Sequence, residues 1–188
     1  MKRIILVMGV VALLAGKVYA ESPTEKGVYS LSGFVSYSHS KDNASGDTSK
    51  TTSLNPAGFY FVYPNLAIGT SIQYLDSKNS SFNMKQYGIG PVIRYYFGNE
   101  TVHPFILLEY LYTKNRMTFP SSNEFKGRGN DLSFGIGVDF FLSKNVALEP
   151  MVRYTFSHAD DHSSISGTSS SRRSEDFFIG LGINVFIF

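Results

Sequence analysis

The chain lacks cysteine and tryptophan altogether, and it is poor in charge. Without cysteine it can form no disulfide, no thiolate nucleophile and no zinc site with cysteine ligands. Charged residues make up 17% of its 188 residues, whereas soluble domains average about 25%. These absences exclude a disulfide scaffold and thiol catalysis, and they disfavour an ordinary soluble domain.

Outside the first twenty residues the chain has no net positive charge. Three of the 17 basic residues, Lys2, Arg3 and Lys17, lie there, and after them the acidic residues slightly outnumber the basic ones. Binding to nucleic acid needs a concentrated basic surface. We therefore expect no nucleic-acid partner.

The chain has one long apolar run, at residues 4–15. It follows two basic residues and precedes a Val-Tyr-Ala sequence at residues 18–20, which is typical of a secretory signal peptide and its cleavage site. The run is shorter than the ~20 residues of a membrane-spanning helix. We predict a cleaved signal peptide over residues 1–20 and one domain over residues 21–188. A buried N-terminal helix is the alternative.

Alternating hydrophobicity dominates the rest of the chain. At the C-terminus every odd position is apolar: Phe177, Ile179, Leu181, Ile183, Val185 and Ile187. Alternation of this kind predicts a strand, and it places Phe188 on the opposite, inner face. A soluble protein seldom exposes an apolar strand edge, because such an edge promotes aggregation, whereas a closed barrel has no edge.

Eight such segments follow one another, at residues 28–37, 53–62, 66–75, 85–97, 104–113, 131–142, 146–157 and 177–188. Each is close to the ~9–11 residues that cross a bilayer at a tilt. Long and short connections alternate between them, as long extracellular loops and short periplasmic turns do in outer-membrane barrels. We predict an all-β fold: an eight-stranded antiparallel up-and-down transmembrane β-barrel with both termini in the periplasm.

Prolines and glycines add detail to this prediction. Pro56, Pro91 and Pro150 fall inside strands, where proline usually marks an edge or a bulge, and we expect local bulges there. Three Gly-x-Gly pairs begin at residues 88, 135 and 180. They lack the third glycine of a dinucleotide-binding loop. Because residues two apart share a face, we expect these glycines to line a narrow interior.

Several short stretches carry a family resemblance: residues 54–62, 65–69, 88–97 and 143–149. Together they resemble the bacterial outer-membrane β-barrel domain family, which contains small eight-stranded barrels related to the OmpA transmembrane domain, OmpX and OmpW. The resemblance implies an outer-membrane location, a Gram-negative source, surrounding outer-membrane lipids, and insertion by the barrel assembly machinery, which recognises a terminal Phe such as Phe188.

Charged residues on the face opposite the apolar stripes form the first candidate site. They are Arg94, Glu109, Asp139, Glu149 and Arg153. Isolated charges in a narrow lumen are costly, so we expect them to pair. We predict an Arg94–Glu109 pair, with Arg153 between Glu149 and Asp139. The set is either an ion-pair network that fills a sealed barrel or the lining of a gated path for small solutes.

Residues 158–162 have the sequence His-Ala-Asp-Asp-His, and Ser163 and Ser164 follow. His and Asp can ligate a divalent metal, and His162 with Ser164 could supply the base and nucleophile of a lipid A deacylase. The segment is rich in Ser and Gly and predicts a loop tip, which positions a catalytic group poorly. We therefore expect no enzyme activity, no metal and no cofactor.

Basic residues in the last two long connections form the second candidate site, namely Lys126, Arg128, Arg172 and Arg173. If these connections face outward, the four residues lie near lipopolysaccharide phosphates, which arginine suits well. Ordinary solvation of loop charge is an equally good interpretation.

We carry three functional hypotheses. The leading one is a non-enzymatic, monomeric outer-membrane barrel that anchors long extracellular loops for surface interaction, including contact with a host ligand, or for envelope integrity. The alternative is a small porin-like channel for ions or small solutes. The third is a lipid A-modifying enzyme.

Overall fold

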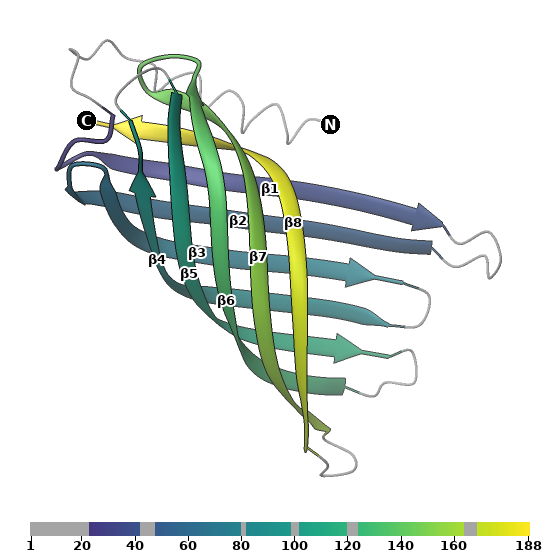
Figure 1. Cartoon of the computed structure of the whole chain (residues 1–188). Coiled ribbons are helices and arrows are strands. Elements are labelled where there is room, and N and C mark those ends of the chain that lie inside the picture. Colours follow the sequence, from purple (N-terminus) through teal and green to yellow (C-terminus); the bar gives the residue numbers. More distant parts are fainter. Residues whose placement is uncertain (1–22, 42–47, 80–81, 99–101, 120–123, 164–168) are drawn as a thin grey trace.

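The computed structural model describes residues 23–41, 48–79, 82–98, 102–119, 124–163 and 169–188. Over these residues the chain forms a closed antiparallel barrel whose eight strands pair in chain order (Figure 1). The predicted all-β, eight-stranded barrel is therefore confirmed. No helix in the described ranges is long and apolar enough to span a membrane. The predicted signal peptide at residues 1–20 lies outside the described residues.

The strands are β1 (Tyr29–Lys41), β2 (Thr48–Tyr63), β3 (Leu66–Lys78), β4 (Asn83–Tyr96), β5 (Val102–Thr118), β6 (Glu124–Phe141), β7 (Val146–Ser163) and β8 (Ser169–Ile187). The start of β1, the end of β8 and the β2–β3, β4–β5 and β6–β7 connections share one end of the barrel, which we call the turn end. The other four connections are at the loop end.

The strands are longer than the sequence predicts, and the connections at the loop end are correspondingly shorter. The prediction of long loops is therefore wrong for the described residues. Most of residues 114–130 and 158–173 lies in paired strands, since β5 and β6 pair from Val102 to Thr118 and β7 and β8 pair out to His162. The alternation signal ends where apolar residues end. The backbone ladder continues, because each hairpin keeps its register beyond the apolar belt and satisfies its own polar groups.

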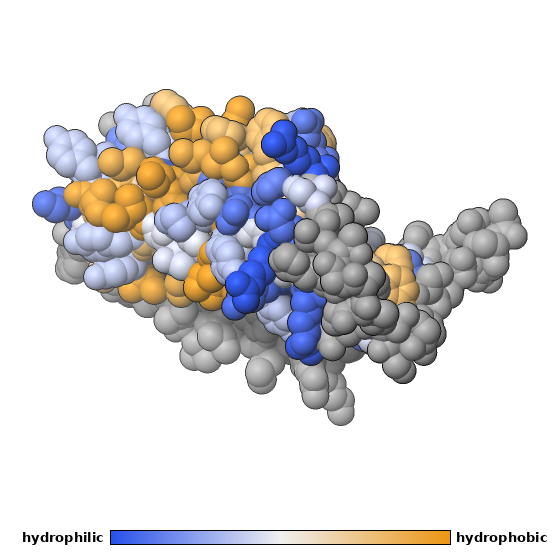
Figure 2. Space-filling view, turned by 90° about the horizontal axis from the view of Figure 1, so that it is seen from below, coloured by the Kyte–Doolittle hydropathy of each residue, from blue (hydrophilic) through white to orange (hydrophobic). Residues whose placement is uncertain are grey.

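The outer face of the barrel is apolar, as the alternation predicts. Ile136 on β6 and Leu142, the residue after β6, are among its most exposed side chains, at 68% and 69%. Aromatic pairs flank this belt: Tyr29–Tyr60 and Tyr95–Phe97 toward the turn end, Tyr74–Tyr87 and Tyr154–Phe156 toward the loop end. Figure 2 shows hydrophobic residues gathered on the surface beside a band of hydrophilic ones. Paired aromatic girdles are typical of a membrane-spanning barrel.

The predicted bulges at Pro56, Pro91 and Pro150 are absent. Beside each proline two residue pairs are missing from one ladder, but the register is the same on both sides of the gap. Proline has no N–H to donate, so the ladder loses a bond without gaining a residue. Between β2 and β3 the register shifts instead between Phe61 and Tyr63, next to the turn.

The β1–β8 pairing that closes the barrel is short. β1 pairs with β2 along its whole length, but with β8 only through Tyr29–Gly33. Beyond this contact β1 and β8 diverge toward the loop end (Figure 1). Inward-facing residues there, such as Ser36 and Asp176, are exposed. The inner face is therefore exposed beside this seam, whereas Thr113 and Asp131 on β5 and β6 stay buried.

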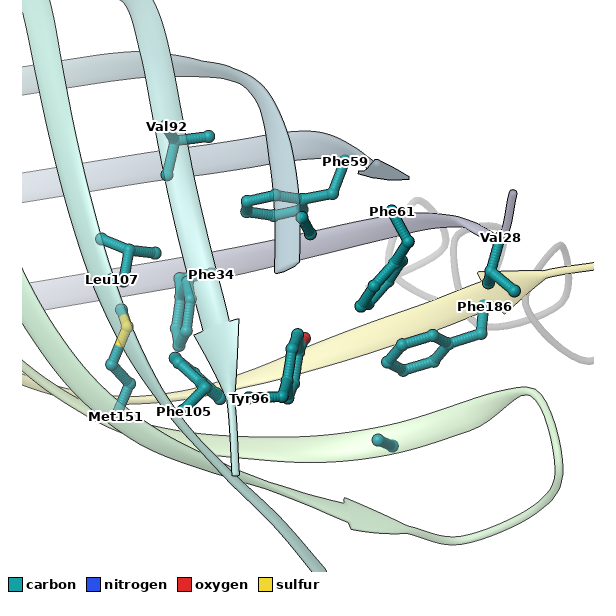
Figure 3. Packing of buried hydrophobic residues seen from close by; sticks show 12 residues of the cluster. Val28, Phe34, Phe59, Phe61, Val92, Tyr96, Phe105, Leu107, Met151 and Phe186 are labelled. Atoms are coloured by element: carbon teal, nitrogen blue, oxygen red, sulfur yellow. The ribbon is translucent and has the colours of Figure 1, made fainter. Parts of the chain in front are cut away.

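The turn half of the interior is filled by aromatic side chains, which we call the aromatic plug: Phe61, Tyr96, Phe105, Phe141 and Phe186. Their rings contact one another at centroid distances of 5.0–6.3 Å. Figure 3 shows the rings of Phe61, Tyr96 and Phe186 directed toward one another from β2, β4 and β8. Phe188 packs against the same cluster, on the inner side as predicted.

The glycine pairs make room for this interior. A Cβ on Gly137 would lie 2.3 Å from the Phe105 ring, and one on Gly182 would lie 2.7 Å from the Phe34 ring. A Cβ on Gly90 would lie 1.9 Å from the Tyr110 carbonyl oxygen. These glycines line the interior as predicted, and larger residues do not fit there.

The residues before β1 cover the turn end. The Thr24 hydroxyl donates a hydrogen bond to Asn65 Oδ1 (2.7 Å), and the backbone N–H of Asn65 donates to the backbone carbonyl of Thr24 (2.8 Å). Thr24 and Val28 are both 2% exposed. The aromatic plug is thus covered by a strap of ordered backbone.

Candidate functional site

A buried ion pair crosses the lumen above the aromatic plug. The Arg94 guanidinium on β4 donates from both terminal nitrogens to the two carboxylate oxygens of Glu149 on β7, at 2.7 and 3.0 Å. Both side chains are at most 1% exposed. Such a fork-to-fork geometry is the strongest form of this interaction.

Aromatic rings hold the guanidinium from two sides. The Arg94 Cζ atom lies 4.4 Å from the Phe59 ring centroid and 4.1 Å from the Phe105 centroid. Cation–π contacts of this kind are strengthened where water is excluded. Arg94, Glu149 and the two rings thus form a layer that occupies the lumen.

A second set of hydrogen bonds joins this layer to Asp139 on β6. The Tyr96 hydroxyl accepts from Arg94 (3.1 Å) and donates to the Asp139 carboxylate (3.0 Å). The Asn184 amide on β8 donates to the same carboxylate oxygen at 2.9 Å. Asp139 is therefore held by neutral donors, and it reaches the arginine only through the tyrosine.

A second ion pair lies closer to the loop end. Arg153 on β7 donates to Glu109 on β5 across 3.0 Å, and their side chains are 11% and 1% exposed. Beside and beyond it the inner polar groups form neutral or single-charge contacts, such as Ser133 with Thr155 (2.8 Å) and Gln86 with Asp131 (3.4 Å). Large aromatic rings give way here to smaller polar side chains, and the carboxylates Asp131 and Asp176 lie on the inner face without a bidentate arginine partner of the Arg94–Glu149 kind among the described contacts.

The ion pairs differ from those the sequence predicts. Arg94 was expected to pair with Glu109, and Arg153 with Glu149 and Asp139, but the two glutamates are exchanged. Arg94 and Glu109 are two positions apart in the β4–β5 register, where Val92 faces Glu109. In a tilted barrel, partners at equal depth come from strands across the lumen rather than from neighbouring strands.

Sequence reasoning missed Tyr96 and Asn184 as members of this network. Both are at positions that alternation places on the inner face, and both are at most 1% exposed. A polar side chain at an inner position was the available signal, because a buried amide or hydroxyl needs a partner.

Comparison with known proteins accounts for this architecture. The outer membrane protein beta-barrel domain family matches residues 6–171. The chain belongs to this family. It is an outer-membrane β-barrel protein of the Gram-negative type, and the cell outer membrane is its location. No curated protein sequence matches the chain.

Solved outer-membrane barrels share its fold. Neisserial surface protein A is 20% identical, with a TM-score of 0.52 over 84% of this chain and 94% of that one. OprG from Pseudomonas aeruginosa is 16% identical, with a TM-score of 0.56 over 89% and 99%. AlkL, solved in DMPC bilayers, is 13% identical, with a TM-score of 0.56 over 92% and 95%. At these identities the likeness concerns the fold.

The His and Asp residues of the predicted loop tip lie on a strand of this outer-membrane barrel. His158 and Asp160 are on β7, 3.8 Å apart. Ser164 and the side chain of His162, the nucleophile and base of the deacylase hypothesis, lie outside the described residues. That hypothesis therefore stays a prediction. Within the described part of the chain no three His, Asp or Glu side chains are grouped as metal ligands.

The predicted lipopolysaccharide contacts also lie on strands. Lys126 and Arg128 face outward on β6, opposite Arg116 and Lys114 of β5. Arg173 on β8 faces outward opposite His158. The side chain of Arg172 lies outside the described residues. The structure therefore separates Lys126 and Arg128 from Arg173 by the width of β7.

Proposed function

We propose that this outer-membrane barrel is a non-enzymatic anchor, sealed toward the periplasm, that presents its loop end at the cell surface. The observation that carries the proposal is the filled lumen. The aromatic plug and the Arg94–Glu149 layer succeed one another along the barrel axis. An eight-stranded barrel normally has an interior just wide enough for such filling.

The location of the paired strands supports the surface role. β6 and β7 each have 18 residues, whereas a bilayer requires about 9–11. The surplus is at the loop end, where it projects beyond the apolar belt. We infer that these strand extensions and their connections are the parts that meet surface ligands, and that the short turns face the periplasm.

A small channel is the competing function. It requires the Arg94–Glu149 layer, the Arg153–Glu109 pair and the plug to move aside together. Each ion pair is buried, and parting a buried pair leaves two desolvated charges. The observation that favours a channel is the short β1–β8 pairing, beside which the inner face is exposed toward the loop end.

Planar-bilayer conductance of the folded protein tests the sealed lumen. We expect no discrete steps from protein that shows the heat-dependent gel shift of a folded barrel. Reproducible steps that change in size or ion selectivity with Arg94→Gln, but not with the outer-wall control Arg128→Gln, would support the channel instead.

The surface role has a separate test. Protease treatment of intact cells should cut the exposed connections and abolish binding of the cells to their target surface. The barrel should keep its gel shift, because its strands are protected. Unchanged binding after complete cleavage would contradict the role of the loop end.

A further inference from the structure

We propose that the outer wall of the barrel binds the phosphates of an outer-leaflet glycolipid at the loop ends of β4, β5 and β6. Five cations, which we call the basic patch, form the site: Lys85, Lys114, Arg116, Lys126 and Arg128. Together with Tyr87 they line a hollow of about 770 Å³. This inference goes beyond the anchoring function, which assigns no ligand to the wall.

The strand register arranges the basic patch in two rows. In the outer row Arg116 lies directly opposite Lys85 on one side and Lys126 on the other. In the inner row Lys114 lies opposite Tyr87 and Arg128. Partners in an antiparallel ladder point to the same side. All five cations therefore project from one face over three adjacent strands.

Like charges directly opposite one another repel across a sheet. The carboxylates in the register are Asp76 opposite Lys85 and Asp160 opposite Arg128 at the flanks, and Glu124, which is two residues from Lys126 on β6. Asp76 also contacts Lys78 (3.6 Å), and Asp160 contacts His158 (3.8 Å). Five cations on one face outnumber these carboxylates, and an anion bound over the patch would be attracted by all five.

The height of the patch identifies the anion as part of a lipid. Lys85 and Lys114 lie two residues beyond Tyr87 and Tyr112 on the same face, a distance of about 7 Å along a strand. Tyr87 and Tyr112 mark the upper aromatic girdle, where a bilayer meets water. The Lys114 Nζ atom lies 5.9 Å from the Tyr112 ring centroid.

A phosphorylated glycolipid matches both parts of this surface. Its acyl chains would lie along the apolar stripes below the girdle, and its phosphates would lie at the level of the patch. Arginine binds phosphate through two parallel hydrogen bonds, and lysine acts as a point charge. A soluble phosphate would contact the basic patch but would make no contact with the apolar stripes.

Binding of lipid A to the folded protein tests the proposal. Lipid A is added to protein in detergent micelles with EDTA, which removes bridging divalent cations, and bound molecules are counted by native mass spectrometry. Two variants each remove one cross-strand pair of the patch, K114Q/R128Q and R116Q/K126Q. The matched control K50Q/K78Q removes a cross-strand pair of lysines at the loop ends of β2 and β3.

We expect saturable binding that each patch variant weakens by at least about tenfold, while the control stays within about twofold of the unmodified protein. Dephosphorylated lipid A should also bind at least about tenfold more weakly. The gel shift must be retained, so that lost binding reports on the patch rather than on folding.

Three outcomes would overturn the proposal. Equal weakening in the control would mean attraction by net charge alone. Equal binding of dephosphorylated lipid A would mean that acyl chains, not phosphates, are recognised. Binding of the deacylated phosphorylated headgroup as tight as that of lipid A would assign the patch to soluble phosphates. None of these results bears on the conductance test, so the two proposals can fail separately.

Discussion

The two halves of the barrel interior are built on different principles. The turn half contains large aromatic rings, a bidentate ion pair and a strap of backbone across its end, with nearly every side chain buried. The loop half contains smaller hydroxyl, amide and carboxylate groups, and its inner face is exposed beside the β1–β8 seam, at Ser36 and Asp176. We infer that the stability of the barrel is concentrated at the turn end, and that the loop end is free to vary.

The largest effect should come from breaking the buried ion pair. Glu149→Ala leaves the Arg94 guanidinium buried without its carboxylate, and we expect the free energy of unfolding to fall by about 3–5 kcal/mol. Urea titration followed by the gel shift measures it. The double variant Arg94→Met, Glu149→Leu should recover most of the loss, because it removes both charges. If the double variant were as unstable as Glu149→Ala, the fall in unfolding free energy would come from altered packing rather than from the unpaired charge.

Overpacking of the turn half should lower the free energy of unfolding by less than the loss of the ion pair does. Gly137→Ala places a Cβ 2.3 Å from the Phe105 ring, and we expect a loss of about 1–3 kcal/mol. Gly135→Ala is a matched control on the same strand and face, since its Cβ meets only ordinary contacts at 3.4 Å. Equal losses in the same titration would show that backbone freedom, not the ring, is responsible.

The loop half should tolerate polar deletion. Ser133→Ala removes one partner of the 2.8 Å contact with Thr155, for which we expect a loss of about 0.5–1.5 kcal/mol. A loss as large as that of Glu149→Ala would contradict the contrast between the halves.

Much of this contrast could be predicted from the sequence. Alternation identifies the eight strands, and it places residues such as Arg94 and Glu149 on the inner face. It does not predict which charges meet, because partners across the lumen depend on strand tilt and stagger. The aromatic plug is equally hidden, since outward and inward phenylalanines look alike in a sequence in which both faces of a strand are apolar.

The loop end was predicted less well for a related reason. Strand signals rest on one apolar face, and β5 and β6 lose that face beyond Tyr112 and Leu132 although their pairing continues. Residues such as Lys126 and Arg128 were therefore assigned to a loop. The cross-strand rows of the basic patch can be recognised only when the register is known.

The short closing contact has a consequence for the order of folding. Seven of the eight strand pairings are hairpins between neighbours in the chain, whereas Tyr29–Gly33 must find residues 183–187 at the far end of the sequence. Closing so long a loop carries the greatest entropic cost, and contacts of this kind slow folding. The β1–β8 pairing should therefore form last during insertion and be lost first under denaturant. An eight-stranded sheet that is paired but not yet closed would be the species that precedes the barrel.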